Sequence, residues 1–276
     1  MASTVASKLV GQVEKDEVRS SANKPPEDAR AYDLVLQGLK HHRNSIISRE
    51  DARKAYDLFS RAVDIDPNYP RALAWKVCST ANLSSWEPEI LGPNWMQEAL
   101  KSIEKALQLD PDDAEANRIM GAMQLSNGNY ESSLAHHRHA CSLCPSDLYI
   151  AAKHCKVLMY DGRLDEAQNE LDRAKKINPT ASDLLYEIEG VLKFWQHDHQ
   201  ASDDIFKRIK FPDPIISVFE SANNYHLGHV DLAAEKVAEI ETDYGLSVER
   251  LIQDEPYRKD EMKSMLEPIL KSSALV

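Results

Sequence analysis

The residues most able to do chemistry gather in one stretch of the chain, HHRHACSLC, which ends at Cys144. Cys141 and Cys144 have the Cys-x-x-Cys spacing of zinc ligands, and His137 lies four residues before Cys141, on the same face of a predicted helix. No second Cys-x-x-Cys pair accompanies them, and free cysteine also serves as a small apolar residue in helix packing. We therefore predict no metal site and no cofactor; His137, Cys141 and Cys144 are the candidate ligands of the alternative, a zinc sensor.

Other patterns that would indicate an enzyme are missing from the sequence. There is no G-x-S-x-G nucleophile elbow, no Walker loop, no G-x-G-x-x-G and no H-E-x-x-H. The carboxylates fall mostly in runs such as DEAQNELDRAKK, where they form i,i+4 pairs with basic residues on an exposed helix face. We expect a protein without catalytic activity.

The elements that position these residues form a repeat. Pro67, Pro111, Pro145 and Pro179 each end a similar segment, and the last three are spaced 34 residues apart. Small residues stand twelve positions before each proline, at Ala55, Ala99, Ser133 and Ala167, and again five before, at Ala62, Ala106, Ala140 and Ala174. Two further repeats without the proline are centred on Ala201 and Ala233. Small residues on one helix stripe let a neighbouring helix approach closely.

Turns within the repeats carry a glycine five residues before the small position, at Gly128, Gly162 and Gly228. Glycine can take positive φ there and end the first helix of a pair, while the proline ends the second. Helix, glycine turn, helix, proline turn at 34 residues is the tetratricopeptide-repeat (TPR) signature. We predict an all-α fold, a right-handed α-α superhelix (TPR solenoid) of about six helix pairs with a C-terminal capping helix.

Three parts follow along the chain: an N-terminal helix and linker at residues 1–28, the TPR solenoid at 29–245, and C-terminal capping helices at 246–276. The second repeat is about ten residues longer than the others, around LSSWEPEILGPNW. This insertion either packs its own aromatic side chains or forms a lip over one end of the groove.

Composition limits the partners and the compartment. Asp and Glu outnumber Lys and Arg by 45 to 33, a net charge of -12, so nucleic acid and anionic membranes are not expected as partners. No apolar run approaches the roughly 18 residues of a membrane span, and the first residues, MASTVASKLVGQVEK, lack a secretory apolar stretch. Four cysteines do not make a disulfide framework in 276 residues. We expect a cytoplasmic protein.

A family resemblance rests on AYDLVLQG in the first repeat, on the long first and second repeats and on the ending LSVERLIQDEPYRKDEMKSMLEPIL. Together they resemble the C-terminal TPR region of bacterial class III adenylate/guanylate cyclase-like proteins and related winged-helix regulators, over roughly residues 5–272. The sequence has neither the cyclase catalytic domain nor a winged-helix segment. The resemblance implies a regulatory region of a signalling protein, which makes no cyclic nucleotide alone.

A helical solenoid offers an extended groove lined by the first helix of each pair. Counting three residues on from each proline sets the register of those helices. The positions expected to face the groove are Arg71, Trp75, Asn82, Glu115, Arg118, Tyr149, Lys153, Lys156, Tyr160, Tyr186, Lys193 and Phe194. This stripe is basic and aromatic within an acidic protein, and such residue types anchor interfaces. The alternative for each aromatic residue is a place in the core between helices.

We predict a non-enzymatic protein–protein interaction scaffold that binds a peptide or a partner domain in this groove, with an acidic segment favoured. Two alternatives stay open: a small-molecule or zinc sensor that uses the His/Cys cluster, and a self-association module in which the apolar segment from Trp86 to Trp95 docks on a second copy.

Overall fold

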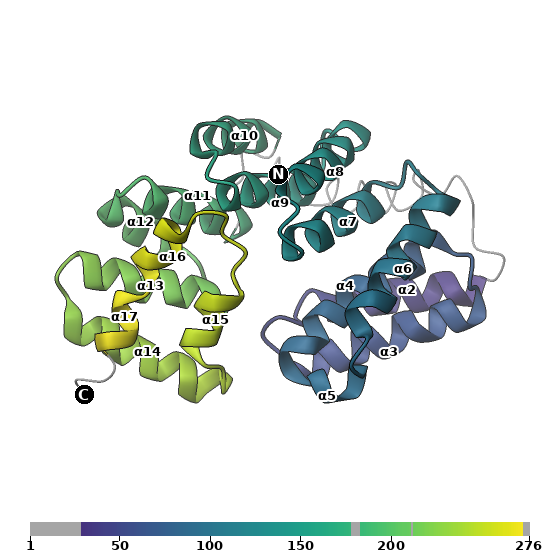
Figure 1. Cartoon of the computed structure of the whole chain (residues 1–276), viewed down its shortest axis with the longest axis horizontal. Coiled ribbons are helices and arrows are strands. Elements are labelled where there is room, and N and C mark those ends of the chain that lie inside the picture. Colours follow the sequence, from purple (N-terminus) through teal and green to yellow (C-terminus); the bar gives the residue numbers. More distant parts are fainter. Residues whose placement is uncertain (1–28, 178–182, 211, 273–276) are drawn as a thin grey trace, which may run out of the picture. The chain divides into compact units, whose positions relative to one another are not determined.

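The computed structural model describes residues 29–177, 183–210 and 212–272 (Figure 1). Within these ranges every regular element is a helix and no strand occurs, as the sequence predicts. The chain divides into two compact units: the first holds the chain up to Ser45 and Glu50–Ala116, and the second holds Ile46–Arg49 and Asn117–Val276. The predicted N-terminal helix and linker, residues 1–28, lie outside the described residues.

The first compact unit pairs its helices around a core in which Phe59 and Trp75 stack with ring centroids 6.1 Å apart. Gly38 makes room for Phe59, because a Cβ atom at position 38 would lie 2.6 Å from that ring. The helices are α2 (Ala29–His42), α3 (Arg49–Ile65), α4 (Pro70–Trp86), α5 (Pro88–Leu91) and α6 (Trp95–Leu109), followed by the start of α7 (Ala114–Ser126).

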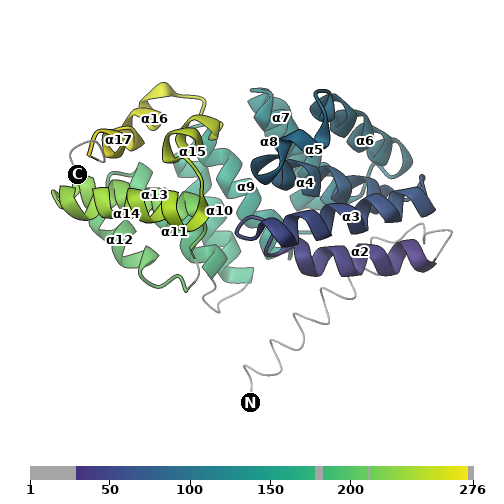
Figure 2. The same ribbon diagram turned by 90° about the horizontal axis from the view of Figure 1, so that it is seen from below.

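The second compact unit continues with consecutive helices that pack on one another in chain order (Figure 2). Each first helix of a pair also contacts the first helix of the next, as α9 does with α11 and α11 with α13, which is solenoid packing. The helices are α8 (Tyr130–Leu143), α9 (Leu148–Tyr160), α10 (Leu164–Ile177), α11 (Asp183–Trp195), α12 (His199–Phe206), α13 (Pro214–His226) and α14 (Val230–Tyr244).

The repeat predicted from the prolines and small residues is confirmed. Helices α4, α7 and α9 begin three residues after Pro67, Pro111 and Pro145, as the counting requires. All eight small positions are buried; the most exposed of them, Ala99, has 6% of its surface accessible. Six helix pairs (α2/α3, α4/α6, α7/α8, α9/α10, α11/α12 and α13/α14) are present among the described residues.

The glycine turns also behave as expected. Gly128, Gly162 and Gly228 have φ of 75°, 74° and 87°, in the left-handed region that glycine tolerates best. His197, with φ of 61°, takes the equivalent place in the fifth pair. This turn corrects the register predicted there: the buried small residue is Ser202, whose hydroxyl donates to the Gly190 carbonyl at 2.8 Å, and the half-buried Ala201 lies one residue early.

The insertion in the second repeat forms α5. Trp86 at the end of α4 donates its indole N–H to the Ser45 carbonyl at 2.9 Å, and Glu87 pairs with Arg53 of α3. Ser45 and Arg53 both belong to the first repeat, so this end of the insertion packs on the neighbouring repeat within the first compact unit.

Three short helices follow α14: α15 (Val248–Asp254), α16 (Asp260–Leu266) and α17 (Pro268–Ser272). They lie against α13 and α14 in Figure 1, and their residues Ile252, Leu266 and Ile269 are buried in the core of the second compact unit. The three-part division of the chain stays a prediction. Among the described residues, none of the helices has both the length and the apolar character that crossing a membrane requires.

Candidate functional site

The second compact unit contains a pocket lined by the first helices of three successive pairs, α9, α11 and α13. We call it the α9–α13 pocket. Its apolar floor includes Met159, Val191 and Phe219, which belong to the unit's core. Its polar and aromatic lining consists of Lys153, Lys156, Tyr160, Glu187, Trp195, Asp213 and Tyr257.

Helix α9 contributes the basic side of the pocket. The Lys153 ammonium lies 5.0 Å from the centre of the Tyr149 ring, and the Lys156 ammonium lies 5.5 Å from the Tyr160 ring, both within cation–π range. Burial acts to lower the pKa of Lys156, but nearby carboxylates, with Glu255 first, outweigh it and leave that pKa raised. Lys156 therefore carries a positive charge at neutral pH.

Helices α11 and α13 contribute carboxylates opposite these lysines. Asp213 caps the start of α13, where its side chain accepts a hydrogen bond from the Ile216 amide at 2.8 Å. Glu187 of α11 is partly buried beside Asp213; desolvation, and then repulsion by Asp213, raise the pKa of Glu187 to about 7. The pocket is thus mixed in charge, where the sequence predicted a basic stripe.

Residues 255–259, which join α15 to α16, lie across this pocket, and we call them the C-terminal strap. Tyr257 is 7% exposed, and its ring centroid lies 4.9 Å from Tyr160 and 4.9 Å from Trp195. The Tyr160 hydroxyl donates a hydrogen bond to the Glu255 carboxylate. The strap was not among the predicted site residues, since nothing in the repeat pattern extends to it.

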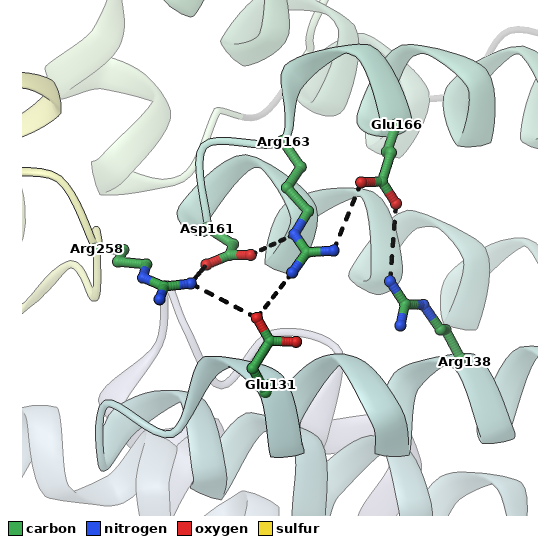
Figure 3. A network of polar contacts seen from close by, with 6 residues as sticks. All are labelled: Glu131, Arg138, Asp161, Arg163, Glu166 and Arg258. Atoms are coloured by element: carbon green, nitrogen blue, oxygen red, sulfur yellow. Dashed lines mark hydrogen bonds and ion pairs between the residues drawn. The ribbon is translucent and has the colours of Figure 1, made fainter.

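One side of the strap is held by an ion-pair network, drawn in Figure 3. The Arg258 guanidinium bonds Asp161 at 2.6 Å and lies 3.7 Å from Glu131. Arg163 bonds the same two carboxylates and continues the network to Glu166. Asp161 is the buried centre, with 1% of its side chain exposed, whereas Arg258 is 49% exposed.

The groove residues predicted in the second repeat have structural roles in the first compact unit. Arg71 pairs with Asp113 at 3.0 Å, and Asp113 in turn accepts a hydrogen bond from the Ala116 amide at the start of α7. Trp75 is buried against Phe59, which corrects the prediction that it faces a groove. Asn82 donates to the Ser45 hydroxyl at 2.6 Å.

The residues predicted in the third and fourth repeats lie partly in the core and partly at the α9–α13 pocket. Arg118 is buried, 3% exposed, with its guanidinium carbon 5.1 Å from the Tyr149 ring centre, and Glu115 is half-buried. Lys153 and Lys156 line the pocket, as does Tyr160, although the strap covers Tyr160 to 5% exposure.

In the fifth pair the prediction selected the wrong face of α11. Phe194 is fully buried between helices, and the Tyr186 hydroxyl accepts a hydrogen bond at 2.6 Å from Arg208, in the turn after α12. Lys193 bonds Gln196 in the following turn. The α11 residues in the pocket are Leu184, Glu187, Ile188, Val191 and Trp195. Adding one repeat length of 34 residues to Lys153 gives Glu187. The repeat spacing therefore indicated Glu187, but the prediction selected basic and aromatic residues of α11 instead.

The structure rearranges the predicted His/Cys cluster. His137 occupies the buried position that Phe59 and Phe206 hold in other pairs; it is 2% exposed, and burial lowers its pKa well below the usual value. Cys141 instead lies beside His154 and Glu170, and the ligand atoms of these three lie within 4.8 Å of one another.

The carboxylate in this group already has a partner, because Arg173 forms a bidentate pair with Glu170. Burial and then Glu170 raise the pKa of the Cys141 thiol to about 12, so the thiol is protonated at neutral pH. Cys144 is not in the group.

No family model matches the chain. The curated relatives include human protein O-mannosyl-transferase TMTC1 (26% identical over 44% of this chain and 13% of the relative), Emericella nidulans protein bimA (30%, 63% and 19%) and human tetratricopeptide repeat protein 13 (25%, 54% and 18%). The chain thus spans less than a fifth of the length of these relatives.

Solved structures that resemble this one include PilW, a type IV pilus biogenesis factor, with a TM-score of 0.55, 18% identity and coverage of 79% of this chain and 96% of that chain. The TPR protein TTC0263 of Thermus thermophilus has a TM-score of 0.50 and 18% identity, and covers 63% and 96%. This chain has the tetratricopeptide-repeat fold. Human IFIT1, solved as a dimer with m7Gppp-AAAA, resembles this TPR chain with a TM-score of 0.60 and 17% identity, over 82% and 55% of the two chains. At these identities the likeness concerns the fold alone.

Proposed function

We propose that this TPR chain is a non-enzymatic scaffold that binds a protein segment or a peptide in the α9–α13 pocket, with acidic segments carrying an aromatic residue preferred. The observation that carries the proposal is the lining itself: two lysines of α9 stand beside aromatic rings at a hollow formed by three successive repeats. Aromatic side chains supply apolar contact area, and the ammonium groups select carboxylates.

The charges of the pocket favour an acidic ligand even though it also holds carboxylates. Nearby carboxylates raise the pKa of Lys156 and keep it charged, whereas Glu187, with a pKa of about 7, carries only part of a negative charge at neutral pH. Asp213 caps α13, and its carboxylate accepts a hydrogen bond from the Ile216 amide. A ligand carboxylate beside the Lys156 ammonium is attracted to it, and Glu187 opposes it with only part of a charge.

Charge reversal on α9 tests the proposal. The probes are two labelled decapeptides that share one tyrosine, one otherwise rich in glutamate and one rich in lysine, measured by fluorescence anisotropy. We expect Lys153→Glu/Lys156→Glu to weaken binding of the acidic peptide at least tenfold, because two attractive charges become repulsive. The exposed Lys101→Glu, on α6, is the matched control and should leave binding unchanged. Equal binding to the double variant, with its helix content intact, contradicts the proposal.

We further propose that the scaffold serves as the regulatory region of a cyclase-like signalling protein, in which occupancy of the pocket changes how an attached effector domain is presented. The resemblance of AYDLVLQG and of the C-terminal segment to that family supports this, and the curated relatives, although from other families, are also much longer than the region they share with this chain. A reducing cytoplasm suits the four cysteines, none of which forms a disulfide among the described residues.

Zinc sensing is the second candidate function, and the Cys141, His154 and Glu170 group favours it. The group offers one thiol, one imidazole and one carboxylate, each from a different helix. Three such protein ligands suffice for a zinc ion that keeps its fourth position open. Stoichiometric zinc in the purified protein that is lost in Cys141→Ser and kept in Cys144→Ser would support this function; metal-free protein that binds no added zinc would end it.

A further inference from the structure

One segment of the chain already lies where a ligand of the α9–α13 pocket would lie. The C-terminal strap is extended at both ends, with φ and ψ of -68° and 124° at Glu255 and of -103° and 124° at Lys259. It runs between two helices of only seven residues each, α15 and α16. Its form is that of a short peptide bound in an extended conformation.

The strap contacts the pocket with side chains and backbone together. Tyr257 inserts between Tyr160 of α9 and Trp195 of α11, in tilted and edge-on ring geometries. The backbone amide of Arg258 donates to the Tyr160 carbonyl at 2.9 Å, and the Tyr130 hydroxyl donates to the Pro256 carbonyl at 3.2 Å. Bound peptides are held by the same combination of an aromatic anchor and main-chain hydrogen bonds.

The strap also satisfies the charge of the pocket. Its Glu255 accepts a hydrogen bond from Tyr160 and is the foremost carboxylate acting on the Lys156 ammonium. Without Glu255, the carboxylates acting on the partly buried Lys156 ammonium would be Asp213 and the partly protonated Glu187. Removing a charge from water is costly unless it is well paired, so a segment that replaces the strap binds best if it brings a carboxylate of its own.

The ion pairs that hold the strap at the rim of the pocket can break. Arg258 is half exposed where it meets the buried Asp161 and the exposed Glu131 (Figure 3), so its guanidinium keeps contact with water, and its pair with Glu131 contributes little to stability. Asp161 keeps a second guanidinium partner, Arg163, so release of Arg258 leaves no buried charge unpaired. Tyr257 is the one strap residue that is buried.

We propose that the C-terminal strap is a resident pseudo-ligand of the α9–α13 pocket, and that partners bind by displacing it with a segment of the same Glu-Pro-Tyr chemistry, a carboxylate followed closely by an aromatic ring. This inference rests on the proposed peptide-binding function and adds to it the partner motif and an autoinhibitory step. Because the strap is tethered, it competes at an effective concentration in the millimolar range for short connections. A weak free peptide therefore binds poorly to the closed protein and well to a protein whose strap has been weakened.

The test uses the full chain and a fluorescent decapeptide with the sequence of residues 251–260, LIQDEPYRKD. We expect Tyr257→Ala to bind this peptide at least tenfold more tightly than the wild type, because the aromatic anchor of the strap is lost and its pocket is free. Arg258→Ala removes the rim ion pairs with Asp161 and Glu131 and the cation–π contact with Tyr130 but keeps the aromatic anchor, so it should give a smaller gain of about threefold. Arg250→Ala is the matched control: this exposed arginine of α15 pairs with Asp254 on the same helix, and the variant should bind as the wild type does.

Peptide variants test the motif. One peptide has Gln in place of Glu at the position of Glu255, and another has Ala in place of Tyr at the position of Tyr257. Each change should remove most of the gain in peptide affinity expected for the Tyr257→Ala protein. If Tyr257→Ala and Arg258→Ala both keep wild-type helix content and neither binds the peptide better than wild type, the strap is a structural closure and the proposal is wrong. Should Tyr257→Ala lose its fold, the result for Arg258→Ala decides.

The experiments distinguish failure of the strap proposal from failure of the proposed peptide-binding function. If the acidic tyrosine peptide binds wild type and loses binding in Lys153→Glu/Lys156→Glu, while opening the strap changes nothing, then the pocket binds peptides and the strap does not regulate it. If neither the acidic peptide nor the strap peptide binds any folded variant, the proposed function fails as well.

Discussion

Glu187 shows how the tertiary structure changes the chemistry of a single residue. It faces Lys153 and Lys156 from α9, Asp213 from α13 and Asp183 from its own helix. Burial and the two aspartates act to raise its pKa, the two lysines act to lower it, and the result is about 7 instead of 4.5. A glutamate that the sequence would make fully charged at neutral pH is therefore partly protonated in the fold.

This shift predicts a pH-dependent stability. Between pH 4.5 and about 7 the folded state holds the Glu187 proton more tightly than the unfolded state, so the free energy of unfolding falls as pH rises through this window. The loss is at most about 3 kcal/mol at pH 8, from 1.36 kcal/mol per pKa unit. We expect the free energy of unfolding of Glu187→Gln minus that of wild type, measured by urea denaturation, to be larger at pH 8 than at pH 5.

The control for this prediction is Glu239→Gln on α14, which is exposed. Its stability relative to wild type should not depend on pH. If Glu187→Gln and wild type differ by the same amount at both pH values, Glu187 is fully ionised in the folded protein and the raised pKa is wrong.

At the scale of elements, the helix pairs depend on contacts between a glycine of the first helix and a large side chain of the second. Gly38 meets Phe59, Gly121 meets His137 and Gly190 meets Phe206 in this way. The absence of a side chain lets the two helices of a pair approach closely, at the cost of a lower helix propensity.

We expect Gly190→Ala to lower the free energy of unfolding by about 1–2 kcal/mol. The new Cβ atom would lie 2.3 Å from Cε1 of Phe206, and this overlap outweighs the gain of about 1 kcal/mol in helix propensity. Chemical denaturation checks the change. Phe206→Leu should cost stability by itself, yet the double variant should lose less than the sum of the two single losses; strict additivity would show that position 190 has room for a methyl group.

Much of this element-level structure could be predicted because it is local. Pro67, Pro111 and Pro145 placed the starts of α4, α7 and α9, since proline ends one helix and the next begins after a turn of fixed length. The fifth pair was misplaced by one residue because His197 stands where glycine would mark the turn. Positive φ at a residue other than glycine leaves no clear trace in a sequence.

At the scale of the whole molecule, the curated relatives share only a small part of their length with this chain. The matched regions make up 13%, 19% and 18% of the three curated relatives described above. We expect the native protein, captured from its host and analysed intact by mass spectrometry, to exceed 31.2 kDa and to carry peptides of a cyclase or winged-helix domain upstream. A native species of 31.2 kDa would instead make the chain a free adaptor and would overturn the proposed cyclase context.

The sequence by itself determined the helix pairs, their turns and the small residues at which they meet, because each of these depends on spacings within 34 residues. The same spacing predicts that Lys153 and Lys156 share one face of α9, and both line the pocket in the structure. Only the tertiary structure decided that α11 presents Glu187 and Trp195, and that the C-terminal strap covers Tyr160. Residues 95 and 97 apart meet there, in Tyr160 with Glu255 and Asp161 with Arg258, and no periodicity in a chain records such a contact.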